Sequence, residues 1–128
     1  MRLLLDTHAL LWWLAGDKQL SPTARWAVED EGNPVYVSAA SAWEVATKHR
    51  LGKLPRIGPL AAGFADEVAR QGFIELPVSL DDGQRAGALG GAHRDPFDRM
   101  LIAQSKAYDL ALISNEEIFD DYGVIRLW

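Results

Sequence analysis

The chain has 128 residues, 48% of them hydrophobic and 24% charged, with a formal net charge of −5. This composition predicts one globular domain over residues 1–128. The absence of cysteine excludes disulfides, cysteine-rich zinc sites and thiol catalysis.

No apolar run approaches the roughly 20 residues that a membrane span needs. The N-terminal leucines lead directly into Asp6 instead of a cleavage site, so we expect no signal peptide. These features predict a cytoplasmic protein that does not contact a membrane.

The first predicted element is a strand at Leu3–Leu5, because an unbroken apolar run is typical of a strand buried on both faces. It ends at Asp6, and apolar residues at helical spacing follow from Thr7. A second helix is expected after Ser21-Pro22, a typical N-cap and first helical residue. It ends near residues 32–34.

A β-branched and aromatic strand is predicted at residues 35–38. Ser41 then precedes Glu44 by three residues, which is the spacing of a capping box. We therefore expect a helix that begins at Ser41 and ends around residues 51–52. A helix over residues 60–70 and a strand over residues 73–76 follow.

The C-terminal half continues the alternation of helices and strands. We expect helices over 79–89, from Asp95-Pro96 to about Tyr108, and a short one over 115–119. Strands are expected at 111–114 and, at a sheet edge, at 124–127. Such alternation predicts an α/β fold with a parallel sheet covered by helices on both faces.

Five acidic residues follow predicted strands or begin predicted helices: Asp6, Glu44, Asp95, Asp98 and Glu116. Residues after parallel strands share one edge of the sheet, so we expect these carboxylates to meet there. Carboxylate oxygens suit Mg²⁺ or Mn²⁺, and a bound ion would relieve their mutual repulsion. Paired ions in such a site can activate water against a phosphodiester.

Each acid also has a structural interpretation, and these alternatives stay open. Asp95 before a proline is a typical helix N-cap. Glu44 completes a capping box with Ser41 or pairs with Lys48 one turn away. Glu116 begins an acidic surface run.

Assigning the five acids to one pocket leaves equal numbers of acids and bases in the rest of the chain. The bases cluster beside the predicted pocket, at Lys48, His49, Arg50, Lys53 and Arg56 and again at His93, Arg94 and Arg99. Basic groups beside a metal site suit a phosphate backbone. An ordinary solvated helix surface is the alternative.

Three segments resemble the sequence motifs of a known protein family: residues 5–12 (LDTHALLW), 38–46 (SAASAWEVA) and 93–104 (HRDPFDRMLIAQ). In this order they resemble PIN-domain proteins, and more closely the VapC-like ribonuclease toxins of type II toxin–antitoxin systems. The resemblance implies a PIN-like α/β/α sandwich with a central, mainly parallel sheet of four to five strands. It also implies Mg²⁺- or Mn²⁺-dependent RNA cleavage and a neutralising antitoxin.

By motif, the resemblance makes Asp6, Glu44 and Asp98 the core metal-site and catalytic acids. Asp95 belongs to the extended third motif. The family's fourth acid is usually an aspartate after the last buried strand, and here the matching position holds Glu116.

The implied mechanism is metal-assisted hydrolysis, with Asp6 and Asp98 on the ion and Glu44 orienting the water that attacks phosphorus in line. The hydroxyls of Thr7 and Ser114 are expected to position water or phosphate. Lys48, Arg50, Arg94 and Arg99 are expected to contact the RNA, whereas His8 and His93 are expected to be structural.

Trp12, Trp13 and Trp43 offer rings on which bases could stack. Large aromatic residues are usually buried, so we expect core or interface positions instead. The sequence does not separate two interface roles, a homodimer face around Trp13 and Leu14 and a groove for an antitoxin helix.

Two other functions compete with the nuclease. A non-catalytic RNA-binding module that has lost its metal is favoured by Glu116 in place of aspartate. A receiver-like phosphoacceptor domain is disfavoured, because Asp6 stands alone after the first strand and Leu76-Pro77-Val78 contains no acid.

Overall fold

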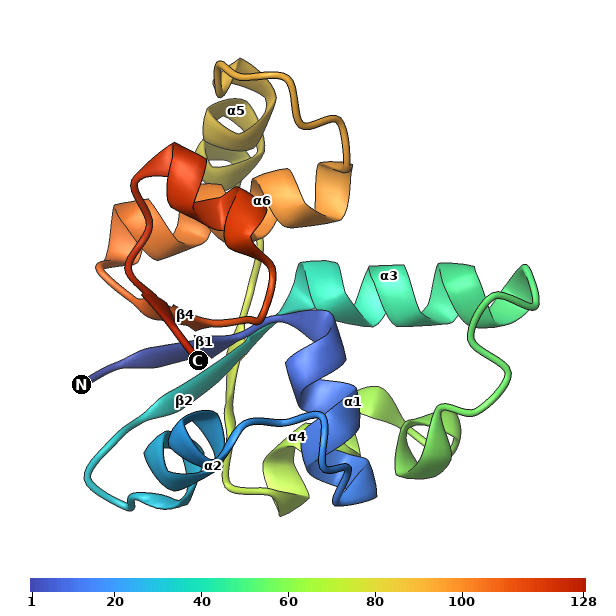
Figure 1. Ribbon diagram of the computed structural model, residues 1–128. Helices are drawn as coiled ribbons and strands as arrows, with labels where there is room; N and C mark the ends of the chain where they lie inside the picture. Colours follow the sequence, from blue (N-terminus) through green and yellow to red (C-terminus); the bar gives the residue numbers. More distant parts are fainter.

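A computed structural model of residues 1–128 contains one sheet of five parallel strands in the order β3-β2-β1-β4-β5 (Figure 1). The strands are β1 (Leu3–Leu5), β2 (Val35–Ser38), β3 (Ile74–Leu76), β4 (Ala111–Ile113) and β5 (Arg126–Leu127). The predicted α/β class, the parallel sheet and the edge position of the last strand are confirmed.

Six α-helices accompany the sheet: α1 (Thr7–Ala15), α2 (Pro22–Glu29), α3 (Ala39–Arg50), α4 (Phe64–Arg70), α5 (Leu80–Ala88) and α6 (Pro96–Tyr108). Two 3₁₀ helices, η1 (Gly58–Ala61) and η2 (Glu117–Tyr122), complete the fold. Figure 1 shows α1, α2 and α4 on one side of the sheet and α5 and α6 on the other. None of the helices has the length and apolar character needed to cross a membrane.

Strand β1 lies at the centre of the sheet and serves both layers. Leu3 and Leu5 pack in one apolar cluster with residues of α1, α2 and α4, whereas Leu4 packs in a second cluster with residues of α6 and η2. All three leucines are fully buried, as expected for successive side chains that point to opposite, covered faces. This burial fixes the position of the residue that follows, Asp6.

The start of α3 differs from the prediction. Ser38 is the N-cap, because its hydroxyl accepts a hydrogen bond from the backbone N–H of Ala40 at 3.0 Å. Ser41 and Glu44 therefore both lie inside the helix, and the predicted capping box between them is wrong.

Two other predicted helices are displaced. The helix expected over residues 60–70 begins at Phe64, since the extended backbone of Gly63 separates α4 from the 3₁₀ turn η1. The helix expected at residues 115–119 is the 3₁₀ helix η2 at Glu117–Tyr122.

The N-terminus of α6 is fixed by Asp95, whose carboxylate accepts from the backbone N–H groups of Phe97 and Asp98 at 2.9 and 3.2 Å. The N-cap interpretation of Asp95 is thus confirmed.

Helix α5 packs against α6 around the buried Asp82. Burial opposes ionisation of Asp82, but hydrogen bonds from Tyr108, Gln104 and Ser79 hold its pKa below the usual value.

Candidate active site

Asp6 follows the central strand β1 and contacts Ser114, which follows the neighbouring strand β4. Its Oδ2 accepts a hydrogen bond from the Ser114 hydroxyl at 2.5 Å, and its Oδ1 accepts from the His8 backbone N–H at 3.1 Å. Asp6 is only 3% exposed. Burial raises the pKa of Asp6 to about 6, with a further increase from the charge of Glu116, although the Ser114 hydrogen bond opposes the shift.

Glu44 lies on the second turn of α3 and is also buried. The Thr7 hydroxyl donates to Glu44 Oε1 at 2.6 Å and lies 3.0 Å from the Ser41 hydroxyl, so one side chain links α1 to α3. The Lys48 ammonium pairs with the other carboxylate oxygen of Glu44, which confirms the predicted helical pair.

The third acid, Asp98, lies in the first turn of α6 and contacts the His93 imidazole, with 2.7 Å between Nε2 and Oδ2. Burial raises the pKa of Asp98 to about 7, and the charges of Asp95, Glu116 and Asp6 add to the increase. This mutual repulsion indicates that Asp98 lies near Asp6, Asp95 and Glu116.

Glu116 reaches this edge from the segment after β4. Its half-exposed carboxylate lies 4.0 Å from His8 Nδ1 and contacts none of the other acids. The charge of Glu116 nevertheless raises the pKa of both Asp6 and Asp98. The position is therefore peripheral to the three buried acids.

The hydroxyls of Thr7 and Ser114 each contact one of the buried acids. Both are buried, and both donate to a carboxylate instead of facing solvent. They hold Glu44 and Asp6 in place, and the expectation that they position water or phosphate stays a prediction.

The loop between α5 and α6 holds His93 against Asp98. The Tyr122 hydroxyl accepts a hydrogen bond from the His93 backbone N–H at 3.0 Å. Gly91, with φ +82°, lies so close to Tyr122 that a Cβ there would stand 2.4 Å from the phenolic oxygen. Sequence reasoning missed this contact of His93, because it depends on Tyr122, 29 residues downstream.

Arg99 secures the same loop. Its guanidinium donates to the carbonyl oxygens of Ala86 at 3.2 Å, His93 at 2.9 Å and Leu89. Most of its hydrogen-bonding capacity is therefore used inside the protein. The structure gives Arg99 a role in positioning the loop, and its contact with RNA stays a prediction.

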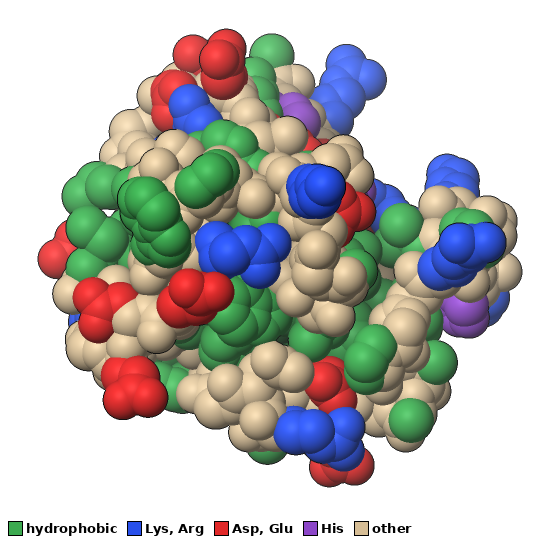
Figure 2. Space-filling model, turned by 60° about the horizontal axis from the view of Figure 1, so that its bottom comes forward, with side chains coloured by type: hydrophobic (Ala, Val, Ile, Leu, Met, Phe, Trp, Pro, Cys, Tyr) green, Lys and Arg blue, Asp and Glu red, His purple; other side chains and the backbone are tan.

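The other three residues predicted to contact RNA differ in whether their charge is already paired within the protein. Lys48 is occupied by Glu44, whereas Arg50 and Arg94 are exposed and form no ion pair. In Figure 2, Lys, Arg and His side chains gather on the lobe projecting to the right, where Figure 1 shows the C-terminal end of α3. Basic side chains thus lie on both helices that carry the acids.

The buried acids suit a hard divalent cation in their chemistry. They offer oxygen donors, and the raised pKa values of Asp6 and Asp98 reflect burial and repulsion that a cation would relieve. No three acidic or histidine side chains converge closely enough to ligate one ion directly. The arrangement therefore fits a hydrated ion, in which water supplies most ligands, as Mg²⁺ usually requires.

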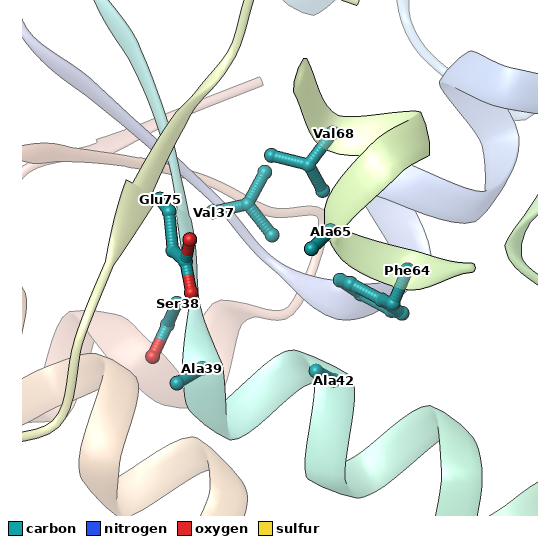
Figure 3. A pocket seen from close by; sticks show the side chains of 8 residues that line it. All are labelled: Val37, Ser38, Ala39, Ala42, Phe64, Ala65, Val68 and Glu75. Carbon is teal, nitrogen blue, oxygen red and sulfur yellow. The ribbon is translucent and has the colours of Figure 1, made fainter. Parts of the chain in front are cut away.

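A separate apolar pocket of about 170 Å³ lies between β2, β3, α3 and α4. Figure 3 shows Phe64 of α4 across from Ala42 of α3, with Val37 and Val68 deeper in the pocket. None of the five acids lines it. The pocket is therefore distinct from the acidic site.

Comparison with known proteins identifies the PIN domain as the family pattern that matches residues 3–125. Among curated proteins, Ribonuclease VapC16 of Mycobacterium tuberculosis (strain ATCC 25618 / H37Rv) is 44% identical over 59 residues. That match spans 46% of this chain and 40% of the relative. The resemblance inferred from the motifs is thereby confirmed.

Two solved structures share the fold. VapBC2 from Rickettsia felis, crystallised with a DNA fragment from its promoter, superposes with a TM-score of 0.69 at 13% identity, over 98% of this chain and 97% of that one. A toxin–antitoxin complex from Klebsiella pneumoniae gives a TM-score of 0.57 at 19% identity, over 89% and 86% of the two chains. At these identities the likeness establishes the fold alone.

Proposed function

Since the chain belongs to the PIN-domain family, we propose that it is a metal-dependent endoribonuclease and the toxin of a type II toxin–antitoxin pair. One observation carries the proposal. Asp6, Glu44 and Asp98 come from three separate elements, and each is buried at the same edge of the sheet with a polar neighbour that fixes its carboxylate. Similarity to a curated ribonuclease supports the same activity.

PIN nucleases depend on metal ions, and we assign Mg²⁺ to this site, with Mn²⁺ as a substitute. Asp6 and Asp98 would hold it, supported by Glu44, Asp95 and Glu116. When bound, the ion supplies positive charge to the phosphate and increases the acidity of coordinated water.

The protein groups hold the reacting parts in place. Ser114 and the His8 backbone N–H fix both oxygens of Asp6. Thr7 fixes one oxygen of Glu44, which orients the attacking water in line with the scissile bond. His93 fixes one oxygen of Asp98 and leaves the other available. Arg50 and Arg94 attract the phosphate backbone.

The proposal is tested by RNA cleavage in Mg²⁺ and in EDTA, with Asp6→Asn, Glu44→Gln and Asp98→Asn. Each substitution keeps the size of the side chain but removes its charge, so we expect a loss of about 100-fold or more. Asp81→Asn, on the exposed surface of α5, is the matched control and should cleave at the parental rate. Equal rates for all variants would exclude this site.

A second candidate, an RNA-binding module without catalysis, is favoured by one observation. Lys48 and His93 already occupy oxygens of Glu44 and Asp98, and no three acids converge on one point. Calorimetric titration with Mg²⁺ and Mn²⁺ separates the two candidates. Absence of binding, together with intact affinity for RNA, would favour the module.

The proposed partners are RNA, a cognate antitoxin and a second copy of the chain. The antitoxin is supported by two structural relatives, a VapBC assembly and a toxin–antitoxin complex. The homodimer and the single PIN domain over residues 1–128 remain predictions. Sedimentation of the chain alone tests the homodimer.

A further inference from the structure

An exposed aromatic pair lies beside the acidic site. Trp43 on α3 is 62% exposed, and its ring centroid lies 4.7 Å from that of Phe97 on α6, with the ring planes at 77°. This edge-to-face geometry is a favourable aromatic contact. Of the two positions predicted for Trp43, the core is therefore excluded and an interface stays a prediction, whereas Trp12 and Trp13 do pack against the core.

The position of the pair follows from helix geometry. Trp43 directly precedes Glu44, and Phe97 directly precedes Asp98. Successive side chains on a helix point about 100° apart. Both acids are buried, and the aromatic pair therefore lies on the rim next to them.

The two helices are close at this point. Helix α3 contacts α6, and the Trp43 and Phe97 rings meet across this contact. The aromatic pair bridges the same two helix segments, which places it at the border of the acidic site rather than on a remote surface.

Two exposed arginines lie within seven residues of the pair in the sequence, Arg50 after Trp43 and Arg94 before Phe97. Arg50 lies seven residues after Trp43, two helical turns along the same face of α3, and is exposed. Arg94, also exposed, lies just before α6. An aromatic face between cations is the arrangement that binds single-stranded nucleic acid, because bases stack on the ring and phosphates contact the cations.

We propose that Trp43, held by Phe97, is a stacking platform for one unpaired RNA base adjacent to the phosphate that is cleaved. The inference rests on the proposed function and adds a subsite to it. Within a duplex both faces of a base are covered by its neighbours, so the platform would select unpaired segments of RNA.

The test measures binding rather than cleavage, in EDTA, with a fluorescein-labelled single strand of RNA. Trp43→Ala should weaken binding about tenfold, the usual effect of losing one stacked base. Trp43→Phe should retain most of the affinity, because phenylalanine also stacks. Trp26→Ala is the matched control, since Trp26 is 70% exposed but lies on α2; it should bind like the parent.

A second series places one abasic nucleotide at successive positions of the RNA. The parent should lose about tenfold at one position, and Trp43→Ala should lose nothing further there, since the same contact is already absent. Unfolding curves of the variants verify that each is folded.

The stacking platform is contradicted if Trp43→Ala binds RNA as tightly as the parent, or if the variant still loses about tenfold at the abasic position to which the parent is sensitive. It is also contradicted if the substitution leaves RNA affinity intact and changes only the oligomeric state, which would make the pair a protein contact. If Trp43 binds a base but Mg²⁺ elicits no cleavage, the proposed catalytic function fails while the platform stands.

Discussion

Replacing Asp6 by asparagine should stabilise the fold at neutral and alkaline pH. In the folded protein Asp6 ionises at a pKa of about 6, compared with its ordinary value of 3.8, because it is buried. This difference corresponds to about 3 kcal/mol. Below pH 3.8 the carboxyl is neutral in both states and costs nothing. As the pH rises to about 6, only the unfolded chain ionises, and the parent loses that stability.

Asparagine matches aspartate in shape but carries no charge. Its oxygen can accept from the His8 backbone N–H as Asp6 does, and its amide can donate to the Ser114 hydroxyl. We therefore expect the variant to gain about 2–3 kcal/mol relative to the parent between about pH 4 and pH 8, most of the full effect of the charge.

Urea denaturation in EDTA at a series of pH values measures this gain. Asp81→Asn, on the surface, should show no comparable dependence on pH. If the stability difference between Asp6→Asn and the parent stays constant over the whole range, or falls as the pH rises, the assignment of Asp6 as a buried, strained carboxylate is refuted.

Three further predictions concern the metal, the loop and the core. Mg²⁺ should raise the melting temperature more at pH 8 than at pH 5. The reason is that Asp6 and Asp98, with pKa values of about 6 and 7, must lose their protons to bind the ion. Equal shifts of the melting temperature at both pH values in a thermal scan would contradict this. Gly91→Ala should lower the free energy of unfolding by about 1–3 kcal/mol, because its backbone is left-handed and Tyr122 fills the space of a Cβ. Gly87→Ala, in open space on α5, should instead raise the free energy of unfolding by about 0.5–1 kcal/mol. Equal effects of the two substitutions in urea denaturation would contradict the close contact between Gly91 and Tyr122. Phe119→Ala should cost about 3–5 kcal/mol in the same assay, since Phe119 is fully buried; a cost below about 1 kcal/mol would mean that η2 does not pack as described.

The parts of the fold that sequence predicts well have local causes. The Leu3–Leu5 run is apolar enough to indicate a central strand, and Ser21 and Asp95 cap their helices immediately before a proline. Asp6 follows the strand directly, so its place at the carboxyl edge needs only the parallel topology. Local sequence therefore suffices to place Asp6 and Asp95 at the ends of the elements they border.

The sequence-based predictions differ from the structure where the sheet, or a residue far along the chain, determines the local arrangement. Ser38 and Ser41 are equally good N-caps in the sequence. Ser38 is the N-cap because β2 ends at that residue, which places the N-cap of α3 three residues earlier than Ser41. The hydroxyl of Ser114 meets Asp6 across 108 residues of chain. Trp43 carries no periodic signal that separates an exposed ring from a buried one.

The most direct test of the central claim is single-turnover RNA cleavage in Mg²⁺ by the parent and by Asp98→Asn, purified identically so that any contaminating nuclease is equal. We expect the parent to cleave RNA in Mg²⁺ and to lose this activity in EDTA. The variant should cleave at least about 100-fold more slowly than the parent. An Asp98→Asn protein that is folded and cleaves RNA at the parental rate would contradict it.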